Sequence, residues 1–287
     1  MHLSSVININ DNHIAKIAEM VADFSGIVLD RLFLKQVVRK ITLQIEKYAI
    51  SGVDEYISML KQGENFTFVM EDLIAALTVS ESYFFRNPNQ FEYLYYEYFP
   101  SFFSDPAKIN MPLRIWSAGC SRGEEPYSVS ILLKNFKNQY PWAEYIIKAG
   151  DINSLNLEAA RKGIFSVRSV RDKFSGFEKI FPEKFGVFND FGNFVIDKKF
   201  AERVVFDKLN LNQGNDLKKL NWSDIIMCRN VLIYFKDDLK TRLLEVFYEY
   251  LNPGGLLLLG ETECLPSDNL KFEIINYKNT YVLKKNK

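Results

Sequence analysis

The spacing of hydrophobic positions changes near the middle of the chain. Between residue 11 and about residue 98 they recur every three or four residues, as at Val37, Ile41 and Ile45. That spacing is typical of amphipathic helices, and no alternating strand pattern interrupts it. We therefore expect a small all-helical N-terminal domain over residues 1–98.

A stretch without periodicity follows this helical part. It contains PSFFSDPAKINMP at 100–112, with three prolines, and clustered prolines punctuate regular structure. We expect a linker at 99–112 and a second domain over 113–287.

Five apolar runs in the second part have the length and bounds of buried strands. They are LRIWSA (113–118), EYIIKAGD (144–151), RVVFDKLN (203–210), SDIIMCRN (223–230) and GGLLLLGE (254–261). Helical patterns follow the first, second and fourth runs, and the C-terminal KFEIINYKNTYVLKK has the pattern of a hairpin. Strands that alternate with helices predict an α/β fold with a mostly parallel sheet.

One segment interrupts the alternation, at about residues 165–202. It is rich in phenylalanine and glycine and contains the short alternating piece NFVID at 193–197. We expect an inserted subdomain with a small antiparallel sheet.

Composition excludes several kinds of chemistry. Lys plus Arg and Asp plus Glu number 36 each, so a globally basic nucleic-acid binder is not expected. The only two histidines, His2 and His13, lie near the N-terminus, which argues against His-dependent hydrolysis and a His-rich metal centre. Three widely spaced cysteines predict no disulfide framework. No secretory signal or run of 18 apolar residues is found, so we expect a cytoplasmic protein that does not insert into a membrane.

The loop AGCSRGEEPYS, residues 118–128, is the first candidate site. Its spacing Gly119-x-x-x-Gly123 matches neither a dinucleotide fingerprint nor a P-loop. Glu124 and Glu125 would repel a pyrophosphate but suit a cationic ligand. They could equally be ordinary glutamates at a helix N-terminus, where the helix dipole favours them.

Asp151 ends the second predicted strand, where a carboxylate commonly binds ribose hydroxyls. It follows the glycine loop by about 30 residues, whereas a dinucleotide fold expects about 20. This weakens a nicotinamide site but not another nucleoside. The alternative is a helix N-cap, for which Asn153 and Ser154 are equally good candidates.

The segment DIIMCRNVLIYF, residues 224–235, places Asn230 at the end of the fourth strand, where its amide offers a donor and an acceptor. Cys228 has no histidine partner and is interpreted as packing. Tyr234 could line a pocket or close the core.

Two basic features remain. Arg86, in SESYFFRN at 80–87, could reach a cleft between the domains or lie exposed on a helix. Arg31, Lys35 and Arg39 form one stripe at helical spacing. Such stripes are usually solvated faces, but this one could guide an acidic protein partner.

These segments together resemble the chemotaxis-receptor glutamate methyltransferases, the CheR family. The resemblance runs in register from about residue 20 to the end of the chain. It is carried by SESYFFRNPNQF, RIWSAGCSRGEEPYSVSILL, AGDINSLNLEAARKGIF, NLNQ, DIIMCRNVLIYF and LNPGGLLLLGETECL.

The resemblance implies a Rossmann-like S-adenosylmethionine methyltransferase fold and methyl transfer to glutamate side chains of chemoreceptors, with S-adenosylhomocysteine as product. Implied catalytic residues are Arg86 and Tyr234, and the basic stripe would meet the receptor helices. Implied cofactor contacts are Ser80, Ser82, Arg86, Ala118, Gly119, Glu124 or Glu125, Asp151, Asn210, Leu211 and Asn230.

The chain departs from the family pattern at Ser82, where Thr is usual, and at Arg122 and Asn153. The insert, FNDFGNFVID, has only a weak glycine-rich and basic signature, so receptor-peptide tethering by strand addition is not expected. The main alternative is a non-catalytic S-adenosylmethionine sensor or adaptor on the same fold. A nicotinamide oxidoreductase lacks its fingerprint here, and the neutral charge disfavours a nucleic-acid methyltransferase.

Overall fold

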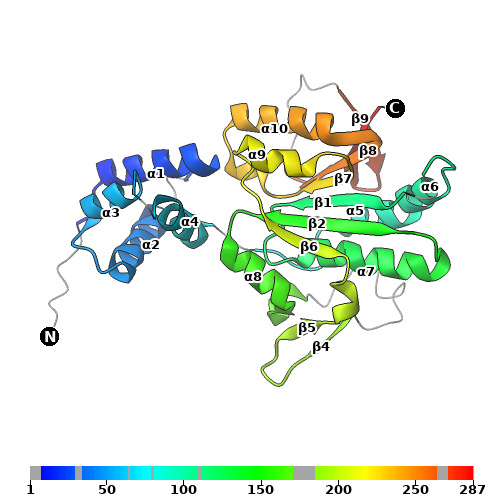
Figure 1. Cartoon of the computed structure of the whole chain (residues 1–287), viewed down its shortest axis with the longest axis horizontal. Helices are drawn as coiled ribbons and strands as arrows, with labels where there is room; N and C mark the ends of the chain where they lie inside the picture. The colour runs from blue at the N-terminus through cyan, green and yellow to red at the C-terminus, as the bar shows by residue number, and fades with distance from the viewer. Residues whose placement is uncertain are drawn as a thin grey trace.

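The computed structural model describes residues 8–29, 34–63, 65–78, 81–108, 111–170, 185–263 and 271–286. The first four helices form a separate helical body beside the rest of the chain (Figure 1). They are α1 (Asp11–Ser25), α2 (Leu34–Lys47), α3 (Val53–Met59) and α4 (Phe66–Leu77). Their apolar stripes meet in a core of their own, which includes Ile17, Ile41, Tyr56 and Leu73. This confirms the predicted helical N-terminus.

The next helical run belongs to the α/β body instead. It consists of α5 (Pro88–Tyr93), the π-helical turn η2 (Leu94–Tyr98) and α6 (Phe99–Phe103). Phe91, Phe99 and Phe103 are buried in the core that also holds the first strand of the sheet. We expected a domain end after residue 98 and a linker at 99–112. This was wrong for residues 99–103, which form a buried helix of the α/β body.

A seven-stranded sheet forms the centre of the body, in the order β6-β2-β1-β7-β8-β10-β9. The strands are β1 (Leu113–Ala118), β2 (Tyr145–Asp151), β6 (Val204–Lys208), β7 (Ser223–Cys228), β8 (Leu251–Leu259), β9 (Phe272–Tyr277) and β10 (Thr280–Lys285). The first five pair in parallel, and β9 and β10 form the antiparallel hairpin at one edge. The predicted α/β fold is confirmed.

Helices cover both faces of this sheet (Figure 1). One face carries α7 (Glu124–Gln139) and α8 (Ser154–Lys162), and the other carries α9 (Gly214–Leu217) and α10 (Asp237–Tyr250). Short 3-10 turns complete the connections at η3 (Val167–Ser169), η5 (Lys198–Phe200), η6 (Lys218–Leu220) and η7 (Leu232–Tyr234). Alternate residues of each strand supply the two cores. Ile115 points to the α7 side, and Trp116 packs with α10.

The insert contains a three-stranded antiparallel sheet in the order β3-β5-β4, as expected. Its strands are β3 (Ile164–Phe165), β4 (Gly186–Phe188) and β5 (Phe194–Ile196). Residues 171–184 of the expected insert lie outside the described residues. Phe84 packs edge-on against Phe165 and Phe194, with ring centroids 4.9 and 5.7 Å away. The insert thus supports the segment that leads to Arg86.

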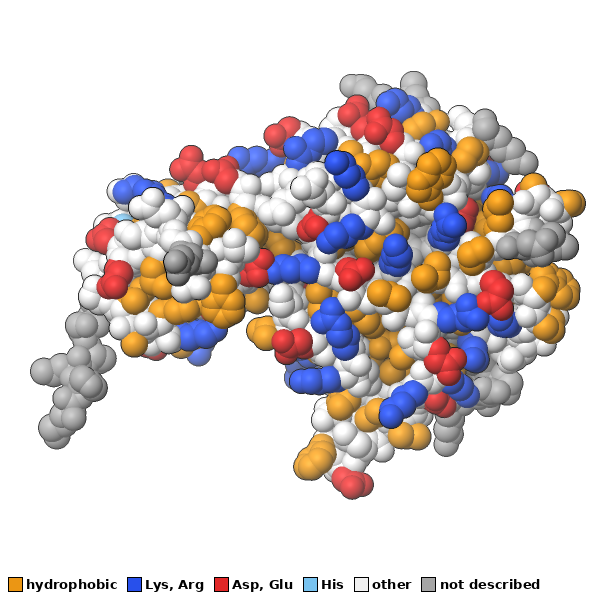
Figure 2. Space-filling view, viewed as in Figure 1, with side chains coloured by type: hydrophobic (Ala, Val, Ile, Leu, Met, Phe, Trp, Pro, Cys, Tyr) orange, Lys and Arg blue, Asp and Glu red, His pale blue; other side chains and the backbone are white. Residues whose placement is uncertain are grey.

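Surface charge is mixed. On the face shown in Figure 2, basic and acidic side chains alternate and do not collect into one basic field. Within the described part of the chain, no helix combines the length and apolar character needed to span a membrane.

Candidate functional site

A cavity of about 1180 Å³ opens at the carboxyl ends of the parallel strands. Residues 119–121 line it after β1, Asp151 ends β2 in its wall, and residues 209–211 and 229–231 follow β6 and β7. The strand order reverses between β1 and β7. Ligands of open α/β sheets bind at such a switch point.

The helical body forms the other wall of the cavity. It contributes Ile27–Leu29 of the α1–α2 connection, Gln36, Val37 and Lys40 of α2, and the end of α4. Hydrogen bonds fasten it there. Val28 N donates to Tyr234 O (2.8 Å), and Asn153 Nδ2 donates to Thr78 Oγ1 (3.1 Å). The cavity is therefore built from both parts of the chain.

The turn after β1 needs glycine for two reasons. Gly119 has φ +80°, and a Cβ there would lie 2.4 Å from Val231 Cγ2. The backbone N–H groups of Gly119 and Cys120 both donate to Gly150 O, at 2.7 and 2.9 Å. These two hydrogen bonds hold the loop against the end of β2, beside Asp151.

The two glutamates of this loop lie in different places. Glu125 lines the cavity, where its Oε1 accepts from Ser117 Oγ (2.6 Å) and its Oε2 from Arg229 (3.0 Å). Glu124 is 1% exposed, does not line the cavity and accepts from Ser169 Oγ (2.9 Å). Burial raises the pKa of Glu124, and hydrogen bonds from its own backbone, Ser169 and Ser82 oppose that rise.

Asp151 is buried in the cavity wall, and its carboxylate is oriented by backbone donors. Its Oδ1 accepts from Asn153 N and its Oδ2 from Ser121 N, both at 2.8 Å. Burial raises the pKa of Asp151, against the effect of these bonds and one from Asn156. Asn153 is the N-cap of α8, which confirms the N-cap interpretation for that residue, while ribose binding by Asp151 stays a prediction.

Asn210 and Leu211 line the cavity beside α1. Asn210 Nδ2 donates to Phe24 O (2.8 Å), so its amide joins the two bodies of the chain. Leu211 is buried and gives the cavity an apolar surface. Cys228, by contrast, is fully buried in the sheet core, in agreement with a packing role.

Asn230 and Tyr234 stand on the loop after β7. Asn230 has a left-handed backbone, φ +58°, and its Oδ1 is a buried acceptor without a partner among the described groups. Tyr234 is 39% exposed and lines the cavity rather than the core. Glu263, which sequence reasoning missed, accepts hydrogen bonds from the backbone N–H groups of this loop.

Arg86 and Ser82 line the cavity from the segment before α5. The Arg86 guanidinium donates to Glu81 O (3.2 Å) and lies over the Tyr83 ring. Arg229, a second residue that sequence reasoning missed, donates to the backbone carbonyl of Arg86. Its position directly after a buried strand was the available signal, because a buried arginine needs partners.

Several of the expected site residues do not line the cavity. Ala118 is buried at the end of β1 and, like Glu124, does not line the cavity. Ser80 and Arg31 lie outside the described residues, while Lys35 and Arg39 are exposed on α2. Arg122 is exposed, and neither Arg122 nor Asn153 lines the cavity. Asn153 nevertheless supports the cavity wall, because its side chain bonds to Thr78.

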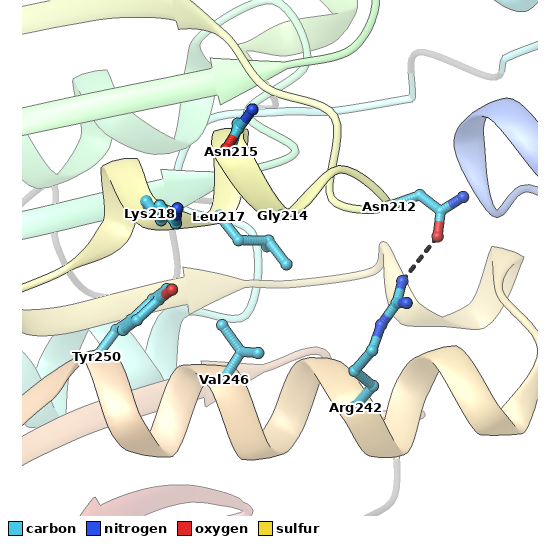
Figure 3. A pocket seen from close by; sticks show the side chains of 8 residues that line it. All are labelled: Asn212, Gly214, Asn215, Leu217, Lys218, Arg242, Val246 and Tyr250. Carbon is cyan, nitrogen blue, oxygen red and sulfur yellow. Dashed lines mark hydrogen bonds between the residues drawn. The ribbon is translucent and has the colours of Figure 1, made fainter.

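A second hollow, of about 480 Å³, lies between α9 and α10. Figure 3 shows Arg242 of α10 reaching Asn212, whose Oδ1 accepts at 2.7 Å. Asn212 Nδ2 in turn donates to Asp23 O near the end of α1 (2.9 Å). This hollow therefore borders a contact that fastens the helical body.

Comparison with known proteins identifies the family. Residues 80–281 match the model of the CheR methyltransferase, SAM binding domain. The chain is 34% identical over 248 residues to chemotaxis protein methyltransferase 2 of Vibrio cholerae, covering 86% of this chain and 82% of that protein. It is 28% identical over 273 residues to the chemotaxis protein methyltransferase of Borreliella burgdorferi, covering 93% of each. The chain thus belongs to the CheR methyltransferase family and is a methyltransferase whose cofactor is S-adenosylmethionine.

Proposed function

We propose that this chain transfers a methyl group from S-adenosylmethionine to glutamate side chains of chemoreceptors, in the cytoplasm. The observation that carries the proposal is that Arg86 lines the same cavity as Asp151 and Asn230. A cation at the wall of a nucleoside-sized cavity suits an anionic acceptor. The relatives named above as chemotaxis protein methyltransferases support the same conclusion.

The residues of the cavity fit the cofactor. Asp151 has acceptor capacity left beyond its two backbone bonds and the bond from Asn156, because a carboxylate has about four acceptor sites. Asn230 Oδ1 is a buried acceptor that awaits a donor, and Leu211 offers an apolar surface for adenine. When bound, S-adenosylmethionine supplies an electrophilic methyl group on a sulfonium centre.

The chain has no need to remove a proton from the acceptor. A glutamate carboxylate is already ionised at neutral pH, so no general base is required. This agrees with a cavity that no histidine lines among the described residues. The work left to the protein is to orient the carboxylate and to exclude water.

Arg86 is the proposed orienting group. Its guanidinium is always charged and can form two parallel bonds to a carboxylate. Its backbone is fixed by Arg229, and the neighbouring Phe85 N donates to Ser128 Oγ (2.9 Å). Tyr234, on the opposite loop, is proposed to close the reacting region against water.

The proposed receptor-facing surface is the exposed side of α2. Lys35, Arg39, Leu43 and Lys47 recur every four residues on this helix, and Leu43 is 53% exposed. Lys47 is paired with Asp72, so Lys35 and Arg39 are the cations that would complement an acidic, amphipathic receptor helix beside Leu43. We do not include the inserted sheet in this surface.

Methyl transfer from radiolabelled cofactor to a receptor signalling fragment tests the proposal. We expect label on the fragment that mild alkali releases as methanol, because carboxyl methyl esters hydrolyse where N-methyl groups do not. Changing the receptor glutamates to alanine should abolish labelling. Alkali-stable label, or label that persists without those glutamates, would overturn the proposed reaction.

A further inference from the structure

Glu263 occupies an unusual position just after β8. Glu263 is only 4% exposed, yet it forms no ion pair with any described residue. Its Oε2 accepts from Gly260 N (2.6 Å) and Asn230 N (2.7 Å). Its Oε1 accepts from Val231 N (2.8 Å) and Ile233 N (3.3 Å). Four backbone dipoles therefore satisfy this buried carboxylate in place of a cation.

These four bonds connect two loops that follow neighbouring parallel strands. Residues 230–233 follow β7, and Gly260 follows β8. A carboxylate has about four acceptor sites, so both oxygens are fully used. Since charge-assisted bonds are stronger than neutral ones, the bonds to Glu263 strongly stabilise the shape of the loop after β7.

The loop carries a side chain that lacks a partner. Asn230 lines the cavity with φ +58°, a conformation that costs energy for a residue other than glycine. Its Oδ1 is buried and accepts no bond within the described part of the chain. A Cβ on Gly260 would lie 2.6 Å from Asn230 Nδ2, so the bare backbone of Gly260 leaves room for this amide.

We propose that Glu263 is a positioning residue for the cofactor. By accepting from the N–H groups of Asn230, Val231 and Ile233, it holds the Asn230 amide where its Oδ1 accepts a hydrogen bond from bound S-adenosylmethionine. The orphaned acceptor is thereby satisfied only in the complex. This inference rests on the cofactor and is independent of the proposed glutamate acceptor.

Calorimetric titration with S-adenosylhomocysteine tests the role without any methyl acceptor. In Glu263→Gln, one oxygen becomes an amide donor that faces two backbone donors. We expect affinity to fall about tenfold, because the Asn230 amide loses the backbone bonds that hold its Oδ1 toward the cofactor. Glu245→Gln, on the exposed side of α10, is the matched control and should bind like the parent chain.

A double-mutant cycle separates positioning from a general loss of structure. If Glu263 acts through Asn230, then Glu263→Gln combined with Asn230→Ala should bind no more weakly than the weaker single variant. Additive losses, or unchanged affinity in Glu263→Gln, would overturn the proposal. If Glu263→Gln fails to fold, Gly260→Ala tests the same cluster, because its Cβ would lie 2.6 Å from Asn230 Nδ2 and 2.8 Å from Glu263 Oε2. Gly260→Ala should also weaken binding, and its combination with Asn230→Ala should bind no more weakly than the weaker single variant. Unaltered affinity or additive losses would again overturn the proposal.

Discussion

Arg229 joins the two sides of the cofactor cavity by donating to the Glu125 carboxylate and to the backbone carbonyl of Arg86. Its side chain is 2% exposed, and the Glu125 side chain is 14% exposed. Burial lowers the pKa of Arg229, and the charge of Glu125 opposes this. Glu125 of the glycine loop and the backbone at Arg86 are therefore parts of one buried network.

We expect this network to require an arginine at position 229. Arg229→Lys keeps the charge but cannot reach both acceptors with one ammonium group. We expect the free energy of unfolding to fall by about 1–3 kcal/mol and single-turnover methyl transfer to slow, because the backbone at Arg86 loses its donor. Urea denaturation and rapid quench measure these two quantities. Arg114→Lys, at an exposed position of β1, is the control, and equal behaviour of both variants would contradict the prediction.

Arg86→Ala separates catalysis from cofactor binding. The backbone carbonyl that Arg229 uses is retained, so the cavity should keep its shape. We expect methyl transfer to fall by at least about 100-fold while affinity for S-adenosylhomocysteine changes little, since the lost contact is with the acceptor. Arg122→Ala, exposed and outside the cavity, should leave both unchanged. Loss of binding with an intact transfer rate would show that Arg86 serves the cofactor instead.

The strands were predictable because burial on both faces of a parallel sheet leaves an unbroken apolar run. The run at 113–118 coincides with β1. The helix at residues 99–103 was not predictable, because Pro100 was interpreted as a residue that interrupts helices. Proline is tolerated in the first turn of a helix, and here Pro100 is the second residue of α6, in which Phe99, Phe102 and Phe103 are buried. The packing of that helix depends on partners far away in the sequence.

The site residues also differ in whether they could be predicted from the sequence. Gly119, Asp151 and Asn230 could be proposed because each stands at the carboxyl end of a predicted strand or directly after it. The position of Arg229 after a buried strand indicated only that it needs partners, and nothing local indicated Glu263, because both roles depend on tertiary contacts. Glu125 lies 104 residues from Arg229, and Glu263 lies 33 residues from Asn230. No local pattern reports such pairs.

Asp151 should make cofactor affinity depend on pH. Burial raises its pKa above the usual 3.8, so acidification protonates it sooner than an exposed aspartate. The ionised form is the better acceptor for ribose hydroxyls. We expect affinity for S-adenosylhomocysteine to weaken as pH falls from neutral through that raised pKa. Asp151→Asn should bind roughly 10- to 100-fold more weakly at pH 7, from the loss of a charged acceptor, and show a flatter profile. Equal pH profiles for both chains, measured calorimetrically, would exclude the ribose role.

Glu124 should affect stability in a way that Glu125 does not, because it is buried away from the cavity. Its folded-state pKa is raised above 4.5, so its ionisation costs stability at pH values above the unfolded pKa. That cost decreases as pH falls through the raised pKa and vanishes below the unfolded pKa. Glu124→Gln cannot ionise but keeps an acceptor for Ser169. Relative to the parent chain, the variant should therefore be more stable at pH 7 than at pH 4.5, by about 1.4 kcal/mol per unit of pKa shift.

Urea unfolding of both chains across this pH range measures that difference, without cofactor or acceptor. Glu158→Gln, at an exposed position of α8, supplies the control and should show a difference that does not vary with pH. A pH-independent difference for Glu124→Gln as well would mean that the buried carboxyl titrates as it does in the unfolded chain. The bonds from Ser169 and from the backbone would then fully offset its burial.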